Sequence, residues 1–296
     1  MKSHHNLLVR RAGLLVLGIC LTVLACENSQ AQTIFRNDFD HYTSSRRYKV
    51  ADMEADWNVP EWNDGVSEGR VRIERSSKAL GGTGACLAVK YPPNLHGTGN
   101  TGAQWKMDLD DAYEEVIATY YVKFKNGTDF VKGGKLPGLA GGTAPTGNAP
   151  ANGTNGWAAR MMWLTPFTGT PGSPKQTAAN LIAYAKYHQS GYHNDGRDED
   201  EIFFTDSGNL VEIEDNRWYK IKQRIKMNSP SSSNGKLQIW LDNKRVVNRH
   251  NIRYRTNSNL GIDVFYFSTF YGGNYSWRTS RWTTAYFDDF KIRVVN

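Results

Sequence analysis

The fold is best indicated by the stretch Tyr120-Tyr-Val-Lys-Phe124 and the segment that follows it, Lys132-Gly-Gly-Lys-Leu-Pro-Gly-Leu-Ala-Gly141. Alternation in the first stretch predicts a β-strand with one set of side chains in a core and the other on an open face. The glycines of the segment predict a sharp turn, and Pro137 would stiffen its far side. Lys135 would then stand on constrained backbone, a position suited to holding an anion.

Similar short runs of alternating apolar and polar residues recur along the chain, separated by turns rich in Gly, Asn and Pro. This pattern is typical of an all-β sandwich or jelly roll in a single domain. Asp242-Asn243-Lys244 predicts the turn of one hairpin, with Leu237, Ile239 and Leu241 on one side. The predicted strands are Val71–Arg75, Ala85–Tyr91, Glu115–Lys125, Ala158–Leu164, Leu181–His188, Trp218–Met227, Lys236–Leu241, Val264–Tyr271 and Trp282–Val295.

Residues 1–31 are expected to be an export signal and not part of the folded domain, 32–296. Basic residues precede the apolar run Ala12–Ala25, which is too short to span a bilayer comfortably. Cleavage before Cys26 would leave a lipid-anchored lipoprotein, whereas cleavage after Ala31 would release the protein. We expect an exported protein with no membrane-spanning segment in either case. If Cys26 is lipidated, Cys86 has no intrachain disulfide partner.

The formal charge of the chain is +7, and the part beyond residue 31 keeps +5, because residues 1–31 hold three basic side chains and one acidic side chain. This excess is compatible with an anionic polymer as partner. No helix-turn-helix, zinc-finger or RNP-like pattern points to nucleic acid. No strand carries the paired carboxylates of a jelly-roll glycosidase, and no Gly-x-Ser-x-Gly elbow is present.

Two of the predicted strands place polar side chains on a common face. With a period of two, Ile182, Tyr184, Lys186 and His188 share one face of the strand Leu181–His188. In the strand Ala158–Leu164, Arg160 and Met162 share a face, while Ala159, Met161 and Trp163 share the other. Lysine and arginine side chains can neutralise an anionic group, and tyrosine side chains can transfer protons. Arg160 as a structural ion-pair partner and Tyr184 as a half-buried sandwich tyrosine stay open as alternatives.

Several motifs resemble those of known lyases. The turn segment is similar to the Lys-Gly-Gly-Lys-Leu-Pro-Gly signature of the β-jelly-roll alginate and glucuronan lyases, polysaccharide lyase families 14 and 20. The resemblance extends over roughly 38–294 and implies a concanavalin A-like β-jelly-roll sandwich. The further motifs are Gly102-Ala-Gln-Trp105, Trp157-Ala-Ala-Arg-Met-Met-Trp163, Arg217-Trp-Tyr-Lys-Ile-Lys222, Phe267-Ser-Thr-Phe-Tyr-Gly-Gly273 and Tyr286-Phe-Asp-Asp-Phe290.

The resemblance also implies roles for particular residues. The turn lysine of these lyases binds the substrate carboxylate, which corresponds to Lys135. Their Ser-x-Arg strand falls on Ala158-Ala159-Arg160, so the arginine is kept and the serine is not. Their Tyr-x-Tyr strand falls on Tyr184-Ala185-Lys186, where lysine replaces the second tyrosine, and Tyr187 would take that place only after a one-residue shift.

We therefore expect a lyase that cleaves a 1,4-linked polyuronate of glucuronan or alginate type by β-elimination. Tyr184 would be the base or acid, Lys135 and Arg160 the carboxylate clamps, and Lys186 and His188 helpers. Gln104, Tyr187 and Tyr271 would contact substrate. The departures from the family pattern keep a second reading open, a non-catalytic carbohydrate-binding protein on the same fold.

We expect a monomer that requires no cofactor and has no metal site in its chemistry. The acidic side chains Asp195, Asp198, Asp200 and Glu201 suggest a calcium loop, but a solvated charge run is the simpler interpretation.

Overall fold

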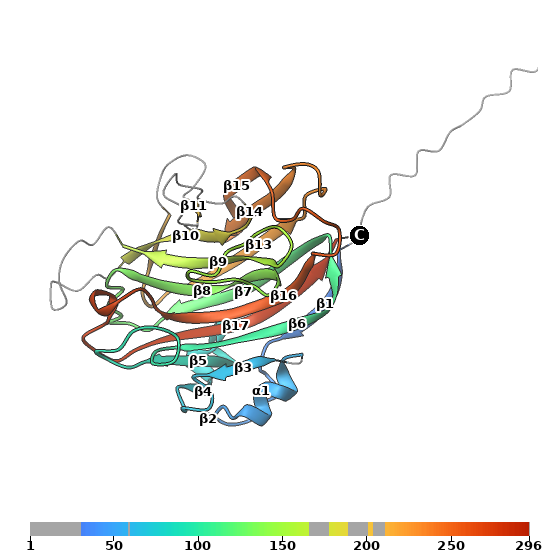
Figure 1. The fold of residues 1–296 in the computed structure, drawn as a ribbon. Coiled ribbons are helices and arrows are strands. Elements are labelled where there is room, and N and C mark those ends of the chain that lie inside the picture. The colour runs from blue at the N-terminus through green and yellow to red at the C-terminus, as the bar shows by residue number, and fades with distance from the viewer. Residues whose placement is uncertain (1–30, 59, 166–177, 189–200, 204–210, 296) are drawn as a thin grey trace, which may run out of the picture.

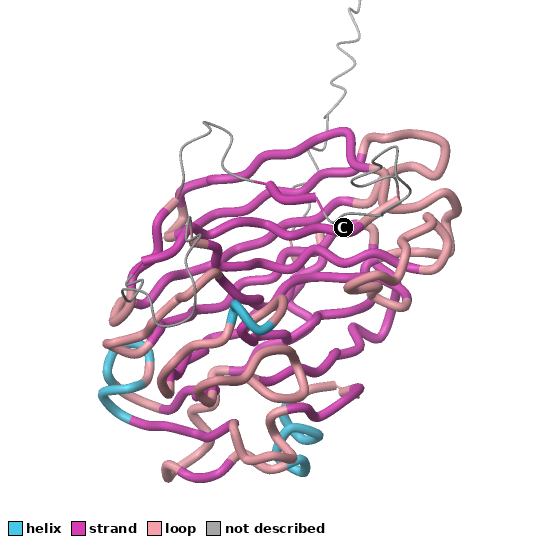
Figure 2. The backbone as a smooth tube through the Cα atoms, turned by 60° about the vertical axis from the view of Figure 1, so that its left-hand side comes forward, coloured by secondary structure: helices cyan, strands magenta, loops and turns pink. Residues whose placement is uncertain are grey.

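The computed structural model describes residues 31–295 except 59, 166–177, 189–200 and 204–210. Two antiparallel β-sheets pack against each other as a β-jelly-roll sandwich (Figure 1). Strands cross the whole molecule and loops gather at their ends, while the few helical turns lie at the margins (Figure 2). The all-β, concanavalin A-like jelly-roll architecture predicted from the sequence is confirmed.

The two sheets are named sheet I and sheet II. Sheet I has the order β15 (Lys244–Ile252), β14 (Gly235–Leu241), β13 (Trp218–Lys226), β7 (Glu115–Phe124), β17 (Thr283–Val294), β5 (Ala85–Tyr91), β4 (Val71–Arg75) and β2 (Arg46–Arg47), with β1 (Gln32–Asn37) also on β17. Sheet II has the order β11 (Glu201–Phe203), β10 (Ala178–Lys186), β9 (Gly156–Leu164), β8 (Gly133–Gly142), β16 (Ile262–Tyr271), β6 (Ala103–Tyr113) and β3 (Glu61–Asp64), with β12 (Glu212–Glu214) also on β10. The helical elements are α1 (Val50–Asp56), η1 (Ser76–Lys78), η2 (Leu80–Gly82) and η3 (Tyr275–Trp277).

The segment around Lys135 is a strand, so its prediction as a turn is wrong. It forms β8 in the middle of sheet II, between β9 and β16. The register against β9 shifts between Leu136 and Gly138, which makes Pro137 the extra residue of a β-bulge. Because of this bulge Leu136 and Leu139, three residues apart, both face the core. Proline fits there, since a bulged residue needs no ladder N–H.

The glycines of β8 serve close packing instead of turning. A Cβ atom added to Gly138 would lie 2.2 Å from the Ala159 carbonyl oxygen, and one on Gly134 would lie 2.3 Å from that of Phe270. Neighbouring backbone therefore leaves no room for a side chain at either position. Gly138, which lies between Arg160 of β9 and Tyr266 of β16, thus leaves the outward face of the sheet without a side chain at that point.

One hydrophobic core lies between the sheets. It includes Trp105 and Phe267, whose rings stack at 3.9 Å between centroids. Buried Gln223 of β13 crosses from sheet I to sheet II: its Oε1 accepts from the Leu139 N–H at 2.8 Å, and its Nε2 donates to the Ala159 carbonyl at 2.8 Å. These two bonds satisfy backbone groups beside the β8 bulge, and so hold the strand that carries Lys135 in place.

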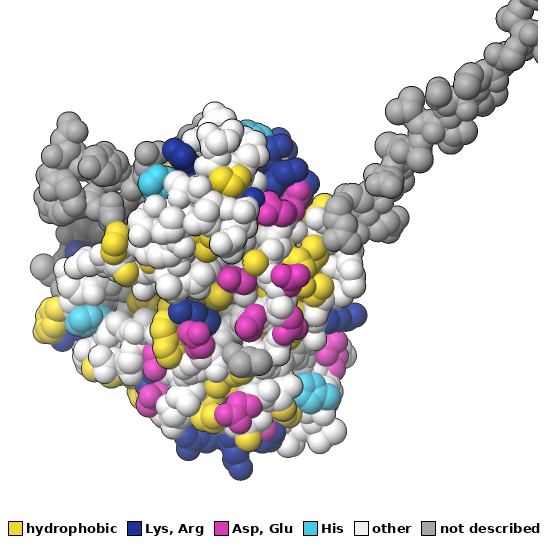
Figure 3. All heavy atoms as spheres, turned by 45° about the vertical axis from the view of Figure 1, so that its right-hand side comes forward, with side chains coloured by type: hydrophobic (Ala, Val, Ile, Leu, Met, Phe, Trp, Pro, Cys, Tyr) yellow, Lys and Arg dark blue, Asp and Glu magenta, His cyan; other side chains and the backbone are white. Residues whose placement is uncertain are grey.

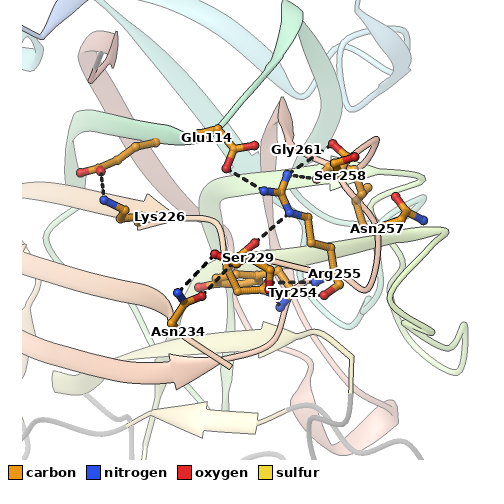
Figure 4. Close-up of polar contacts among 12 residues, drawn as sticks. Glu114, Lys226, Ser229, Asn234, Tyr254, Arg255, Asn257, Ser258 and Gly261 are labelled. Carbon is orange, nitrogen blue, oxygen red and sulfur yellow. Dashed lines mark hydrogen bonds and ion pairs between the residues drawn. The ribbon is translucent and has the colours of Figure 1, made fainter. Parts of the chain in front are cut away.

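A buried arginine ties three loops together at one end of the sandwich. Arg255, 4 % exposed, pairs with Glu114 at 2.7 Å and donates to the carbonyl oxygens of Leu260 at 2.8 Å and Asn228 at 2.9 Å (Figure 4). Glu114 belongs to the turn between β6 and β7, Asn228 follows β13, and Leu260 precedes β16. The guanidinium thus replaces hydrogen bonds that water would otherwise provide to these carbonyls.

Replacing Arg255 by Met is expected to lower the free energy of unfolding by about 2–4 kcal/mol, because several buried acceptors lose their donor. Urea denaturation followed by tryptophan fluorescence measures the change. Arg253→Met is the matched control, since Arg253 is half-buried and, among the residues that the structure describes, makes only one long hydrogen bond, 3.4 Å, to the Pro230 carbonyl. A loss no larger than that of the control would contradict this role for Arg255.

The other strands predicted from the sequence are present, with bounds shifted by at most three residues. The predicted hairpin turn is confirmed: Asp242 and Asn243 have φ of 49° and 68°, and Leu237, Ile239 and Leu241 are buried. Residues 1–30 with Cys26, most of the loop 165–177 and the acidic side chains at 195, 198 and 200 lie outside the described residues. Among the described helices, none is long and apolar enough to cross a membrane.

Candidate active site

A cleft of about 740 Å³ opens on the outward face of sheet II. Its floor is formed by β16, β8, β9 and β10, and loops before β6 and after β8 and β16 contribute to its walls. The lining residues are Trp62, Gly97, Thr98, Gln104, Lys135, Thr146, Gly147, Asn148, Arg160, Met162, Leu164, Tyr184, Tyr266, Phe270, Gly272, Gly273 and Trp277.

Lys135, Met162 and Tyr184 meet on this floor. Lys135 lies opposite Met162 in the β8–β9 register, and its Nζ is 3.2 Å from the Met162 sulfur. The same Nζ lies 3.0 Å from the centroid of the Tyr184 ring, which reaches it diagonally from β10. Lys135 is 8 % exposed, whereas Tyr184 is half-buried. A recessed cation thus lies against the ring of an accessible tyrosine.

Arg160 provides a second recessed cation beside the first. It is 4 % exposed and lies opposite Tyr184 in the β9–β10 register. Its Nη1 donates to the Ser268 hydroxyl at 3.2 Å, and its guanidinium lies 5.0 Å from the ring centroid of Tyr266. Gly138 separates the strands of Arg160 and Tyr266 without a side chain, so the guanidinium can extend across β8.

Polar and aromatic groups of β6 and β3 continue the cleft past Tyr266. The Tyr266 hydroxyl donates to Gln104 Oε1 at 3.2 Å, and Gln104 Nε2 donates to Asp64 at 2.8 Å. Trp62 is 47 % exposed, with its ring 6.0 Å from that of Tyr266. Lys106 Nζ lies 4.3 Å from the Trp62 ring centroid. This edge offers a flat apolar surface next to hydrogen-bonding groups, as sugar rings require.

Four of the residues predicted from the sequence come together in the cleft: Lys135, Arg160, Tyr184 and Gln104. Lys186 is on the predicted face, opposite Ala158, but it is 2 % exposed and does not line the cleft. His188 lies beyond the end of β10, where an added Cβ on Gly153 would be 3.0 Å from its ring. Burial and the nearby Arg253 lower the pKa of His188. The structure therefore separates both predicted helpers from the cleft.

The two remaining predictions, Tyr187 and Tyr271, are wrong as cleft residues. Tyr187 packs on the core side, with its ring 5.8 Å from that of Tyr254. Tyr271 is 1 % exposed and its hydroxyl donates to the Asp129 carbonyl, within the core between the sheets. Both follow the ordinary alternation of a strand: Tyr271 shares the parity of Phe267, which also faces the core.

Several cleft residues were not predicted from the sequence, although a signal for some of them existed. Tyr266 and Phe270 have the parity opposite to Phe267 in β16, so the same alternation places them in the cleft. Met162 was placed on the face of Arg160 but given no role. Trp62 lies in the short strand β3, whose sequence shows no periodic pattern from which a strand could be predicted.

The two cleft tyrosines sit in different surroundings. Burial raises the pKa of Tyr266 above its ordinary value, and the attraction of Arg160 offsets this only in part. Tyr266 therefore remains a neutral phenol that can donate a hydrogen bond or a proton. Tyr184 is more open to solvent and lies against the Lys135 ammonium. An accessible phenol beside a cation is a suitable group for proton transfer.

The cleft on this β-jelly roll thus combines recessed cations with flanking aromatic rings. The family model Polysaccharide lyase 14 matches residues 81–290. The chain thus belongs to polysaccharide lyase family 14, and it is a polysaccharide lyase.

Solved structures share this fold. The structure of alginate lyase Aly36B superposes with a TM-score of 0.71 at 22 % identity, over 88 % of this chain and 97 % of that one. The family 14 alginate lyase of Aplysia kurodai gives a TM-score of 0.65 at 19 % identity, over 89 % and 100 %. The endo-β-1,4-glucuronan lyase of Trichoderma reesei gives 0.50 at 11 % identity, over 85 % and 95 %. A comparison with curated protein sequences found no match.

Replacing Trp62 by Ala is expected to raise KM about five- to tenfold and to change kcat little, because an aromatic platform contributes to binding away from the reacting atoms. Trp282→Ala is the matched control: Trp282 is 64 % exposed and does not line the cleft. Steady-state kinetics on the polymer substrate measures both variants. A normal KM for Trp62→Ala would remove Trp62 from the binding surface.

Proposed function

We propose that this protein cleaves a 1,4-linked polyuronate of alginate or glucuronan type by β-elimination. The observation that carries the proposal is the meeting of two recessed cations, Lys135 and Arg160, with the accessible Tyr184 in one cleft. Family membership supports the class of reaction. The fold is shared with alginate lyases and with a glucuronan lyase, and both polymers are chains of uronates.

Each group has a part in the proposed reaction. Lys135 and Arg160 bind the substrate carboxylate, so that the negative charge that develops when the C5 proton leaves is stabilised. Tyr184 takes this proton. The electron pair of the broken C5–H bond then forms the C4=C5 double bond, and the C4–O bond breaks. The departing O4 oxygen must receive a proton. The candidate donor is the neutral phenol of Tyr266, whose ring lies next to the carboxylate-binding Arg160. The products are a new reducing end and an unsaturated uronate.

Two solved complexes of the structural neighbour support the choice of residues. They hold alginate tetrasaccharide in a variant lacking a lysine and a tyrosine, and alginate trisaccharide in a variant lacking a lysine and a methionine. The same three residue types meet here as Lys135, Tyr184 and Met162. This coincidence favours an oligouronate as the occupant of the cleft. We propose that the reaction needs no cofactor.

Ultraviolet absorbance during incubation with a panel of polymers tests the proposal. The panel is polymannuronate, polyguluronate, polyglucuronate, pectate and a glycosaminoglycan. Only elimination creates the conjugated double bond that absorbs, so a rise on one polymer identifies both reaction and substrate. Absence of a rise on every polymer would refute the proposed reaction, and retained binding to one of them would then favour the non-catalytic carbohydrate-binding alternative.

We also propose that the protein acts outside the cytoplasm, on the basis of the apolar run that precedes Cys26. If Cys26 carries a lipid, Cys26→Ser should move the protein from the membrane fraction to the soluble fraction. An unchanged distribution would favour cleavage after Ala31.

A further inference from the structure

The outward face of sheet I carries a row of cations that the proposed reaction does not use. Along β13 the side chains of Tyr219, Ile221, Gln223 and Ile225 are buried. The alternate residues Lys220, Lys222, Arg224 and Lys226 point the other way, to solvent. Residues two apart in a strand are about 6.6 Å apart, so these four charges span roughly 20 Å in a line.

Neighbouring strands widen this row. Across β7, Lys291 of β17 and Lys222 of β13 both lie opposite Thr119. Arg293 and Arg224 both lie opposite Ile117. Strands are about 4.8 Å apart, so the β17 cations lie about 10 Å from those of β13. The basic face is defined as Lys220, Lys222, Arg224, Lys226, Lys291 and Arg293.

Acidic groups neutralise only one part of the basic face. Glu115 pairs with Arg224 and, at 3.4 Å, with Lys226. Asp288 is 4 % exposed and accepts from the Leu80 N–H at 2.9 Å, and Asp242 at the strand end pairs with Arg217 at 2.8 Å. Within the described residues, Lys220, Lys222, Lys291 and Arg293 take part in no ion pair. Burial, Arg293, Lys220 and Arg224 together lower the pKa of Lys222, as expected where like charges crowd.

The charge of the molecule is unevenly distributed. On the side of the molecule drawn in Figure 3, acidic side chains gather near the middle, and most Lys and Arg side chains lie towards the margins. The basic face is different, because its cations lie together in the middle of a sheet. Aromatic rings also lie beside this face: Lys222 Nζ is 3.8 Å from the Trp240 ring centroid, and on the neighbouring strand β7, Lys123 Nζ is 4.8 Å from that of Trp218. Such rings add flat apolar surface between the charges.

We propose that the basic face is a second, non-catalytic binding site for a linear acidic polysaccharide with one carboxylate on each sugar. A repeating line of cations matches a repeating line of carboxylates, and the half-exposed rings match the apolar faces of the sugars. The site lies on the far side of the sandwich from the cleft, because Gln223 points inward from the same strand to the floor beneath the cleft. That the bound polymer is the substrate itself rests on the proposed function.

This arrangement has a consequence for affinity. A short oligosaccharide in the cleft cannot reach the opposite sheet, whereas a long polymer, or a gel of such polymers, can occupy both sites. Two linked sites raise the apparent affinity for the polymer without any new contact in the cleft. The basic face should therefore matter for long chains and not for short ones.

The test uses the full-length protein with Tyr184→Phe, so that the polymer is not degraded. Lys220→Gln/Lys222→Gln is compared with Lys49→Gln/Arg47→Gln, which removes the same charge from exposed positions beside α1. Arg224 and Lys226 are left in place because they neutralise the buried Glu115. Affinity electrophoresis in gels containing polymannuronate, polyguluronate or polyglucuronate measures polymer binding, and calorimetry with the corresponding tetrasaccharide measures binding to the cleft.

The expected result is an approximately tenfold loss of polymer affinity in Lys220→Gln/Lys222→Gln, with the tetrasaccharide affinity and the control variant unchanged. Polymer affinity within twofold of the parent would overturn the second site. An equal loss for the tetrasaccharide would also overturn it, because the effect would then act through the cleft. Since binding is measured without turnover, a loss of polymer binding would support the basic face even if no polymer gave the absorbance rise that the proposed function requires.

Discussion

Tyr184→Phe is expected to lower kcat by about 10²- to 10⁴-fold, the usual contribution of a group that transfers a proton in the transition state. The substitution removes the phenol oxygen and keeps the ring on which the Lys135 ammonium rests, 3.0 Å from its centroid. Binding of an oligosaccharide should therefore persist while turnover is lost. Initial rates from absorbance, together with calorimetric binding of the same substrate, measure the two effects separately.

Tyr187→Phe is the matched control for this experiment. Tyr187 lies three residues further along the chain, but its ring packs near Tyr254 and does not line the cleft. Its hydroxyl should be dispensable for turnover. Tyr184 does not transfer the proton if the kcat of Tyr184→Phe stays within tenfold of the parent. The same conclusion follows if kcat decreases no more in Tyr184→Phe than in Tyr187→Phe.

Lys135→Met is expected to reduce kcat/KM by about 10²- to 10³-fold, because a preorganised cation that stabilises developing negative charge is lost. Methionine keeps much of the length of the side chain next to Met162, so the floor of the cleft should stay packed. The rate on the polymer that gives the largest absorbance rise is the readout. Thermal unfolding of the variant checks that the fold is intact.

Lys132→Met provides the comparison for Lys135. Lys132 is a nearby lysine at the start of the same segment, but its Nζ donates to Ser276 at 2.8 Å and it does not line the cleft. Both variants lose one positive charge, so a general effect of net charge would reduce kcat/KM equally in both. A loss confined to Lys135→Met assigns the effect to the cleft; equal losses would count against a carboxylate-binding role.

Strands with regular alternation could be predicted from the sequence. β4 and β5 have the predicted bounds. In β9 the alternation also holds, because Arg160 and Met162 line the cleft while Ala159, Met161 and Trp163 lie in the core. Regular alternation works because one face of each strand packs on the shared core. β8 could not be predicted in this way, because the bulge at Pro137 interrupts the two-residue period. The glycines of β8 are also the residues typical of turns.

The candidate site could be predicted only in part, for a related reason. Lys135, Arg160 and Tyr184 lie on three adjacent strands, and the sequence does not contain the register that brings them together. The exposure of a residue also depends on what covers it: Lys186 has the parity of Tyr184 but is buried. The Tyr271 prediction failed because it followed a motif and not the alternation of its own strand.

The glycines of β8, the strand that carries Lys135, limit how this lyase can change. A Cβ on Gly134, Gly138 or Gly141 would come within 2.1–2.3 Å of a backbone oxygen of a neighbouring strand or loop. Mutation at these positions would displace main chain and disturb every group above them. Variation in substrate preference is therefore expected to arise by exchange of side chains that stand on the unchanged floor, such as Met162, Leu164 and Phe270. In directed evolution, libraries confined to those three positions should yield more folded variants with altered sugar preference than libraries that include β8.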